Sequence, residues 1–235
     1  MATKLTTIGF DADDTLWHNE RFFQMTQAHF AELLAEFAEP ANLMDRLLQA
    51  EKRNLGHYGY GVKGFTLSMI ETAIEVTDGR VGASVIAEIL DAGRDMLQHP
   101  VDLLPHAQQA VELARQTHSI VLITKGDLLD QERKLAQSGL GDLFHGVEIV
   151  SDKTPQTYAD IFARHGKGAE TGLMIGNSMR SDVLPMIDAG GWGVFVPHAQ
   201  EWELEKATPP KTNDRFRTLP NLSGLSKLIA KIETS

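Results

Sequence analysis

A short apolar run that ends in a cluster of acids constrains this chain more than any other stretch. Ile8 to Phe10 has the character of a buried parallel strand, and Asp11 stops it abruptly. Asp13 and Asp14 follow within three residues. In open α/β sheets, ligands bind at the carboxyl ends of the strands. The stretch therefore indicates a ligand site at the end of the first strand.

The charges in this cluster favour a cation. Two unit charges about 4 Å apart repel by roughly 4 kcal/mol at an effective dielectric near 20. A site that holds Asp11 and Asp13 close together therefore predicts a bound metal ion and chemistry on an anion. On this stretch alone, a strand followed by an Asx turn and a helix N-cap at Asp14 or Thr15 fits equally well.

Composition narrows the classes of partner. The 235 residues include 22 basic and 32 acidic side chains, which gives a net charge of −10. This balance argues against a nucleic-acid backbone or an anionic membrane as the main partner, but it allows a small anionic substrate in a locally positive pocket. The chain has no cysteine, no apolar run long enough to cross a membrane, and no apolar core of a signal peptide near its start. We therefore expect a cytoplasmic location.

Strands and helices alternate from about residue 100 onward. We expect strands at Ser119–Thr124, Val147–Val150, Gly172–Gly176 and Gly193–Val196, separated by helices at His106–Gln116, Leu128–Ser138, Pro155–His165 and Ser181–Ala189. A surface loop at Ala207–Asn213 and an amphipathic terminal helix follow. With the first strand, this pattern predicts an α/β fold whose core is a doubly wound, Rossmann-like parallel sheet of five strands.

A helical block of about 80 residues separates the first strand from the second. Because a βα connection normally takes about 2–6 residues, this block is predicted to be an inserted subdomain, which we call the cap. The glycine-rich stretch Gly56–Gly64 is expected to be a loop within it. That loop is either a flexible connector or a recognition loop that brings Tyr58, Tyr60 and Lys63 to the substrate, and we favour recognition.

Four strand ends carry polar side chains of the same kind. The first gives Asp11 and Asp13, and the second gives Thr124, followed by Lys125 and Gly126. Lys153 follows the third predicted strand, and a loop that runs from Asn177 to Asp182 follows the fourth. Each residue alone is a weak signal. Their order and their shared position at strand ends make the combination informative.

This order of motifs resembles the haloacid dehalogenase-like hydrolase superfamily. That family has a DxDxT-type turn, a Ser or Thr at the end of the second strand, a lone Lys, and an acid-containing loop after the fourth strand. All four are present here, and the resemblance covers nearly the whole chain. It implies a core domain of residues 1–17 and 100–235 and a helical cap of residues 18–99.

The resemblance also implies roles for individual residues. Asp11 would attack phosphorus and form an aspartyl-phosphate, and Asp13 would serve as the general acid and base. Thr124, with Lys125 and Gly126 beside it, would bind phosphoryl oxygens, and Lys153 would offset negative charge. The function implied is hydrolysis of a small phosphorylated metabolite, with Tyr58, Tyr60 and Lys63 as candidate substrate contacts.

Magnesium is the cofactor that the resemblance implies. Asp11, the backbone carbonyl of Asp13, and Asp182 would hold it, since Mg²⁺ prefers oxygen ligands. One departure from the family pattern is Asn177, which stands where an acid often follows the glycine. Its carbonyl oxygen can still contact the metal or its water, but the site loses one negative charge. We therefore expect magnesium to be held less tightly.

Three other functions compete with the phosphatase. A phosphomutase would use the same residues, and the sequence does not separate the two. A 2-haloacid dehalogenase is the second alternative. That branch of the family uses no metal and generally lacks the second aspartate, so Asp13 argues against it. A non-catalytic binding protein is the third alternative. The sequence leaves the identity of the substrate and the oligomeric state open.

Several of these side chains also fit simpler explanations. Lys153 could be a surface lysine before a helix, and Asp182 could be a first-turn acid favoured by the helix dipole. Asp14 is interpreted as a capping or turn residue. The nine histidines show no metal-ligand spacing, and most are expected to be ordinary surface or packing residues. His18 follows the first motif closely and is a candidate to face the substrate.

Overall fold

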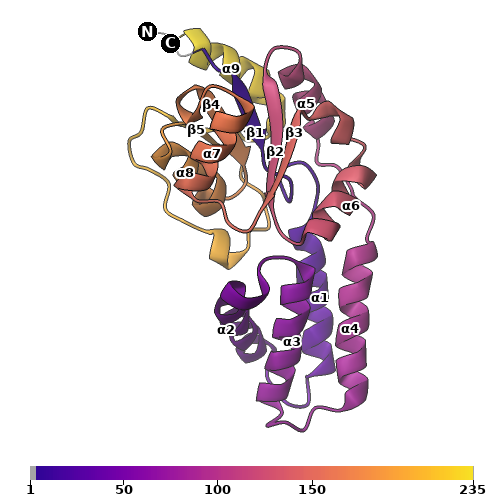
Figure 1. Ribbon diagram of the computed structural model, residues 1–235. Helices are drawn as coiled ribbons and strands as arrows, with labels where there is room; N and C mark the ends of the chain where they lie inside the picture. Colours follow the sequence, from indigo (N-terminus) through magenta and orange to yellow (C-terminus); the bar gives the residue numbers. More distant parts are fainter. Residues whose placement is uncertain (1–3, 235) are drawn as a thin grey trace. The chain divides into compact units, whose positions relative to one another are not determined.

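The computed structural model describes residues 4–234 and forms two compact units (Figure 1). The α/β unit contains the chain up to Glu20, Val101–Lys125 and the chain from Gln131 onward. The helical unit contains Arg21–Pro100 and Gly126–Asp130. The predicted division into a core of 1–17 and 100–235 and a cap of 18–99 stays a prediction, and its residues 1–3 and 235 lie outside the described chain.

The α/β unit is built on a parallel sheet with the strand order β3-β2-β1-β4-β5-β6. The strands are β1 (Thr7–Phe10), β2 (Ser119–Lys125), β3 (Gly146–Val150), β4 (Gly172–Gly176), β5 (Trp192–Phe195) and β6 (Phe216–Thr218). The order reverses between β1 and β4, which pair directly, and this switch point is where ligands bind in doubly wound sheets. The predicted fold is therefore confirmed, and its central strand carries Asp11 at its carboxyl end.

The five predicted strands are present, and β6 adds a sixth that the sequence did not predict. It pairs with β5 in parallel register, with Phe216 opposite Gly193. Three residues are too short for any periodicity to emerge, and β6 follows a stretch without regular structure at Ala207–Asn213. Its place in the sheet depends on β5 rather than on its own sequence.

Two apolar layers cover the sheet on opposite faces. Helices α5 (Ala107–Arg115) and α9 (Leu225–Thr234) pack on one face, over Ile8 and Phe10. Helices α7 (Pro155–His165) and α8 (Leu184–Asp188) contribute to the layer on the other face. A side chain at Gly9 would meet Ile123, Met174 and Phe162 within about 3 Å, so glycine lets this second layer approach the central strand.

Helix α8 is shorter than the helix predicted at Ser181–Ala189. A π-helical turn, Met179–Val183, precedes it and carries Asp182. Helix α6 (Leu128–Ser138) has the predicted bounds. π-Helical turns occur frequently at functional sites, because the extra residue re-aims the side chains around it.

The helical unit contains α1 (Glu20–Leu33), α2 (Pro40–Tyr58), α3 (Val62–Val76) and α4 (Ala83–Gln98), with α3 packed beside both α2 and α4 (Figure 1). They enclose an apolar core of their own that includes Phe30, Leu43 and Met69. The predicted loop at Gly56–Gly64 is wrong, because only Gly59–Gly61 interrupts the helices. Gly64 lies inside α3, where an added Cβ would lie 2.7 Å from the backbone oxygen of Gly59. Its role is this close approach rather than chain flexibility.

No helix among residues 4–234 is long and apolar enough to cross a membrane.

Candidate active site

Asp11 is held at the switch point of the sheet. Its backbone N–H donates to the oxygen of Ile175 in β4 at 2.9 Å, which continues the pairing of β1 with β4. Its side chain is buried, and the two carboxylate oxygens have different partners: Lys153 Nζ lies 2.5 Å from Oδ1, and Thr15 Oγ1 donates to Oδ2 at 2.9 Å. A carboxylate fixed in this way is oriented before any substrate arrives.

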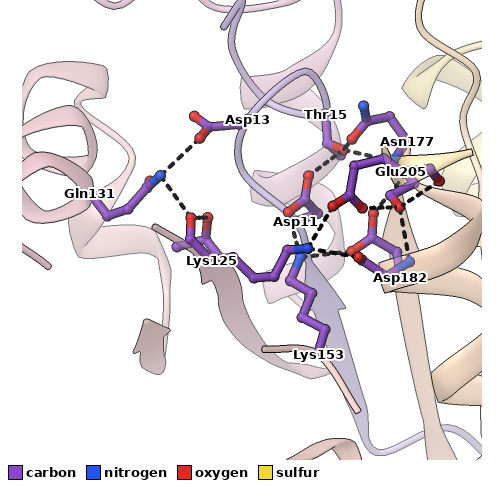
Figure 2. Close-up of polar contacts among 12 residues, drawn as sticks. Asp11, Asp13, Thr15, Lys125, Gln131, Lys153, Asn177, Asp182 and Glu205 are labelled. Carbon is purple, nitrogen blue, oxygen red and sulfur yellow. Dashed lines mark hydrogen bonds and ion pairs between the residues drawn. The ribbon is translucent and has the colours of Figure 1, made fainter. Parts of the chain in front are cut away.

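Lys153 bridges two buried carboxylates (Figure 2). Its ammonium contacts Asp11 at 2.5 Å and Asp182 Oδ1 at 2.7 Å, and its side chain is only 2% exposed. Burial alone would lower the pKa of Lys153, but the charges of the two aspartates outweigh burial and raise it. Burial, aided by the charge of Asp182, raises the pKa of Asp11 to about 7 against the opposing charge of Lys153. With both acids ionised, the cluster carries a net charge of −1.

Asp182 is positioned by the π-helical turn and by a glycine. Its Oδ2 accepts a hydrogen bond from the backbone N–H of Ser178 at 2.9 Å. A side chain at Gly176, the last residue of β4, would lie 2.0 Å from that same oxygen. Glycine at this position therefore gives Asp182 access to Lys153.

Asp13 is held by three donors. Its carboxylate accepts from Trp17 Nε1 at 2.7 Å, from Gln131 Nε2 at 2.8 Å and from Lys134 Nζ at 3.0 and 3.2 Å. Figure 2 shows the side chain directed toward Gln131, whereas Asp11 is directed toward Lys153. The two aspartates of the first motif therefore have separate surroundings. Asp13 contacts an indole N–H, an amide and an ammonium group, whereas Asp11 is buried against Lys153.

Asn177 presents an amide to a group of oxygens. The amide atom that faces them lies 3.1 Å from the backbone oxygen of Asp13, and 3.2 Å from both Asp11 Oδ2 and Thr15 Oγ1. With its NH₂ group in that place, Asn177 donates to all three. With its oxygen in that place, it completes an oxygen set whose spacings match the edge of an Mg²⁺ octahedron, about 3.0 Å for bonds near 2.1 Å. Asp11, the backbone oxygen of Asp13 and Asn177 therefore fit the ion, whereas the contacts of the Asp182 carboxylate are with Lys153 and with the backbone N–H of Ser178.

The predicted phosphate-binding residues lie at the end of β2, but Lys125 has other partners. Thr124 is buried, and Gly126 has a positive φ of 136°. The Lys125 ammonium lies 2.7 Å from Glu205 Oε1 and 2.8 Å from Ser181 Oγ. In the described structure its charge is thus offset by a carboxylate that the sequence analysis did not single out.

Glu205 is the most deeply involved residue that sequence reasoning missed. It lies in the short turn Glu203–Glu205 between β5 and β6, and it also accepts a hydrogen bond from Ser178 Oγ. Burial alone would raise the pKa of Glu205. The charge of Lys125 and the hydrogen bonds that the Glu205 carboxylate accepts outweigh burial and lower this pKa. No spacing relates this glutamate to the first motif.

The partners of Asp13 were also missed. Gln131 and Lys134 are three residues apart on α6, so both reach the same carboxylate from one face of the helix. The spacing of Gln131 and Lys134 predicts a shared partner only when it is already known that α6 lies beside the first motif. Trp17 offered a closer signal, since its indole N–H reaches back four residues.

The three candidate substrate contacts belong to the helical unit. Tyr58 ends α2 and donates to Glu71 at 3.0 Å, and Tyr60 lies in the turn that follows. Lys63 is in the first turn of α3, where it pairs with Asp127 at 2.9 Å. Their contact with substrate stays a prediction.

Comparison with known proteins decides the family. A family model described as haloacid dehalogenase-like hydrolase matches residues 5–190. The chain belongs to the haloacid dehalogenase-like hydrolases. The resemblance inferred from the four motifs is thereby confirmed, and the protein is a hydrolase of that family.

Solved structures agree with this family and extend over nearly the whole chain. A haloacid dehalogenase-like family hydrolase from Xanthomonas campestris is 42% identical, covers 98% of this chain and 92% of its own, and has a TM-score of 0.87. No curated protein matches the sequence.

More distant haloacid dehalogenase-like folds differ in their described activities. A 2-haloacid dehalogenase from Pseudomonas syringae pv. Tomato is 18% identical, with 97% and 99% of the two chains covered and a TM-score of 0.61. A predicted phosphoglycolate phosphatase from Haemophilus somnus is 15% identical, with 95% and 97% covered and a TM-score of 0.65. At these identities the likeness shows the fold alone.

Proposed function

We propose that this hydrolase is a magnesium-dependent phosphatase that acts on a small phosphorylated metabolite through an aspartyl-phosphate. The observation that carries the proposal is the second aspartate, held by Trp17, Gln131 and Lys134 two residues after a buried nucleophile. An alkoxide leaving group must be protonated as it departs, whereas a halide leaves as a stable anion. A firmly positioned carboxyl group two residues after the nucleophile therefore suits phosphate esters better than haloacids.

The reaction follows from the roles of the two aspartates. One carboxylate oxygen of Asp11 forms a bond to phosphorus while the bond from phosphorus to the ester oxygen breaks, and Asp13 gives its proton to that oxygen. A water molecule then attacks the phosphorus and passes a proton to Asp13. The acyl-phosphate P–O bond to Asp11 breaks, inorganic phosphate leaves, and both aspartates return to their first state.

The remaining residues are proposed to bind the phosphoryl group and to offset its negative charge. Lys153 lies against Asp11 and is suited to stabilise the negative charge that gathers near the reacting phosphoryl group. Thr124, Lys125 and Gly126 are proposed to bind phosphoryl oxygens, with Lys125 exchanging its contact with Glu205 for the substrate. We expect the substrate to be a small anion rather than a nucleic acid or a membrane lipid, given the net charge of −10. A cytoplasmic location stays a prediction.

The magnesium site would consist of Asp11, the backbone carbonyl of Asp13, Asn177 and Asp182. The ion supplies positive charge that offsets the repulsion between a phosphate dianion and a carboxylate. The net charge of −1 on the cluster of Asp11, Asp182 and Lys153 supports a cation here, and so does the oxygen set around the Asn177 amide.

Phosphate release tests the proposal. The wild type and Asp11→Asn are assayed on a panel of phosphorylated metabolites and on p-nitrophenyl phosphate, with magnesium and with EDTA. We expect magnesium-dependent release that Asp11→Asn abolishes. No release from any compound by the folded wild type would contradict the phosphatase. A burst of a bisphosphorylated intermediate instead of steady release would indicate the phosphomutase.

A 2-haloacid dehalogenase is the second candidate, and Asn177 is the observation that favours it. With its NH₂ group toward Asp11 and Asp13, the amide satisfies these oxygens without a metal. Lys153 then offsets the charge of the nucleophile unaided. Chloride release from 2-chloropropionate in EDTA would favour this candidate over the phosphatase.

A further inference from the structure

Two histidines converge on an aspartate at a place that the proposed phosphatase does not use. Asp14, His18 and His198 each offer one ligand atom, and these atoms all lie within 4.8 Å of one another. All three residues belong to the α/β unit, with Asp14 and His18 after β1 and His198 after β5. About 180 residues of sequence separate the two histidines, so no local spacing reveals the set.

The carboxylate of this cluster is rigidly held. Asp14 is 6% exposed and has a positive φ of 60°, in the left-handed region. Its Oδ1 accepts from the backbone N–H of Asn19 at 2.8 Å, and its Oδ2 from that of Glu20 at 2.9 Å. The Asp14 side chain therefore accepts from N–H groups at the start of α1, but the predicted N-cap at Asp14 or Thr15 is wrong, because the helix begins at Glu20. These contacts orient the carboxylate but give no reason for two imidazoles beside it.

The imidazoles are held as well. His198 Nδ1 lies 3.7 Å from Asp14 Oδ1 and 2.8 Å from the backbone oxygen of Gln200, so the backbone of the same loop fixes the ring. The rings of His18 and His198 meet edge to face with centroids 5.8 Å apart. The His198 side chain is 12% exposed, which leaves a route from solvent to the cluster.

The ligand types in this set suit a divalent transition-metal ion. Neutral imidazole nitrogens with one carboxylate suit borderline divalent cations such as Zn²⁺, Co²⁺ or Ni²⁺, whereas Mg²⁺ prefers oxygens alone. Around a tetrahedral Zn²⁺, with bonds of about 2.0–2.2 Å, ligand atoms lie about 3.3–3.6 Å apart. The ligand atoms of Asp14, His18 and His198 lie within 4.8 Å of one another, and small side-chain rotations bring them to this spacing.

We propose that Asp14, His18 and His198 bind one divalent transition cation of the zinc class, at a site separate from the oxygen set around Asp11. Three protein ligands leave a fourth position of the cation open to water or to a small anion. The cation would tie the turn after β1 to the loop after β5. Because it binds only the folded chain, it raises the melting temperature as its free concentration rises above its dissociation constant.

Cobalt binding tests the site, because the visible absorption of Co²⁺ reports its ligands. The wild type, His18→Gln and His198→Gln are titrated with Co²⁺ in millimolar Mg²⁺, which fills the oxygen set. We expect one Co²⁺ per wild-type chain, and a weakening of about 100-fold or more in each variant, since even groups that only orient a ligand contribute about 10–100-fold. The matched control is His29→Gln, a half-exposed histidine of α1, which should bind as the wild type does.

Two results would overturn the site. Equal Co²⁺ affinity in wild type, His18→Gln and His198→Gln would remove the histidines from the site, and complete displacement by Mg²⁺ would move the cation to the oxygen set. A second measurement needs no variant: the EPR spectrum of one equivalent of Cu²⁺ on the wild type should show coupling to two imidazole nitrogens. Coupling to none would contradict the proposal. Neither readout depends on phosphatase activity, so the site can fail while the proposed function stands.

Discussion

Replacing Lys153 by methionine tests the electrostatic account of the buried cluster. The ammonium lies 2.5 Å from Asp11 and 2.7 Å from Asp182, with 2% of the side chain exposed. At an effective dielectric of 20, each contact contributes about 6 kcal/mol of gross attraction, most of which offsets the desolvation of three charges. Lys153→Met keeps the length of the side chain but leaves two carboxylates unpaired. Removing one partner of a buried pair costs about 3–5 kcal/mol, which is the loss expected at pH 8.

The same account predicts how this loss depends on pH. Burial raises the folded-state pKa of Asp11 to about 7, above its value in the unfolded chain. Between about pH 4 and pH 7, the folded state therefore binds a proton that the unfolded state has released. Because the charge of Lys153 opposes this rise, the pKa of Asp11 lies higher still in Lys153→Met, so lowering the pH neutralises one of the two carboxylates that the substitution leaves unpaired. We expect the loss at pH 5 to be about half of that at pH 8.

Urea unfolding at both pH values measures the effect. The exposed Lys167, changed to methionine, is the control and should lose less than about 0.5 kcal/mol at either pH. A loss below 1 kcal/mol at pH 8 would refute the buried-pair argument. A loss of the same size at pH 5 and pH 8 would refute the assignment of the penalty to unpaired carboxylates.

Three further substitutions probe the rest of the site. Asp13→Asn should lower kcat by about 10²–10⁴-fold in phosphate-release assays and leave Mg²⁺ affinity unchanged by calorimetry, because only the backbone oxygen of Asp13 is assigned to the metal. Asn177→Asp should bind Mg²⁺ more tightly in the same titration, since it adds a negative charge to the oxygen set; an unchanged affinity would mean that Asn177 is not near the ion. Glu205→Gln should destabilise the fold by about 1.5–3 kcal/mol at pH 7 by leaving Lys125 without its carboxylate. The pKa of Glu205 is lowered in the folded state, so thermal melts should show this loss disappearing as the pH falls below about 4.

The strand ends could be predicted because each is marked locally. Asp11 interrupts an apolar run, Thr124 closes another, and Asn177 follows the glycine that ends β4. An apolar run that stops at a polar residue indicates both where a strand lies and which of its ends lies at the ligand-binding edge of the sheet. The parallel sheet and the protein family could therefore be predicted from the order in which these polar residues follow the apolar runs.

Partners from distant parts of the chain could not be predicted in this way. Glu205 reaches Lys125 across 80 residues, and Gln131 reaches Asp13 across 118. In the sequence, Glu205 looks like any other acidic residue of a loop, and only the folded structure shows that it lies beside Lys125. The error at Gly56–Gly64 has a different cause: glycines that allow close helix packing look the same in sequence as glycines that permit a turn.

The central position of β1 also has a consequence for folding. Its neighbours are β2, which begins at Ser119, and β4, which begins at Gly172, so the first strand made is among the last to be fully paired. At about 5–20 residues per second, synthesis of the roughly 110 residues between β1 and β2 takes about 6–20 s. Within Arg21–Pro100, α3 packs against α2 and α4, its neighbours in sequence, so these helices can form during that time. Newly made chains would thus carry an apolar, unpaired strand ahead of a folded helical segment, and agents that shield exposed strands should raise the yield of native protein.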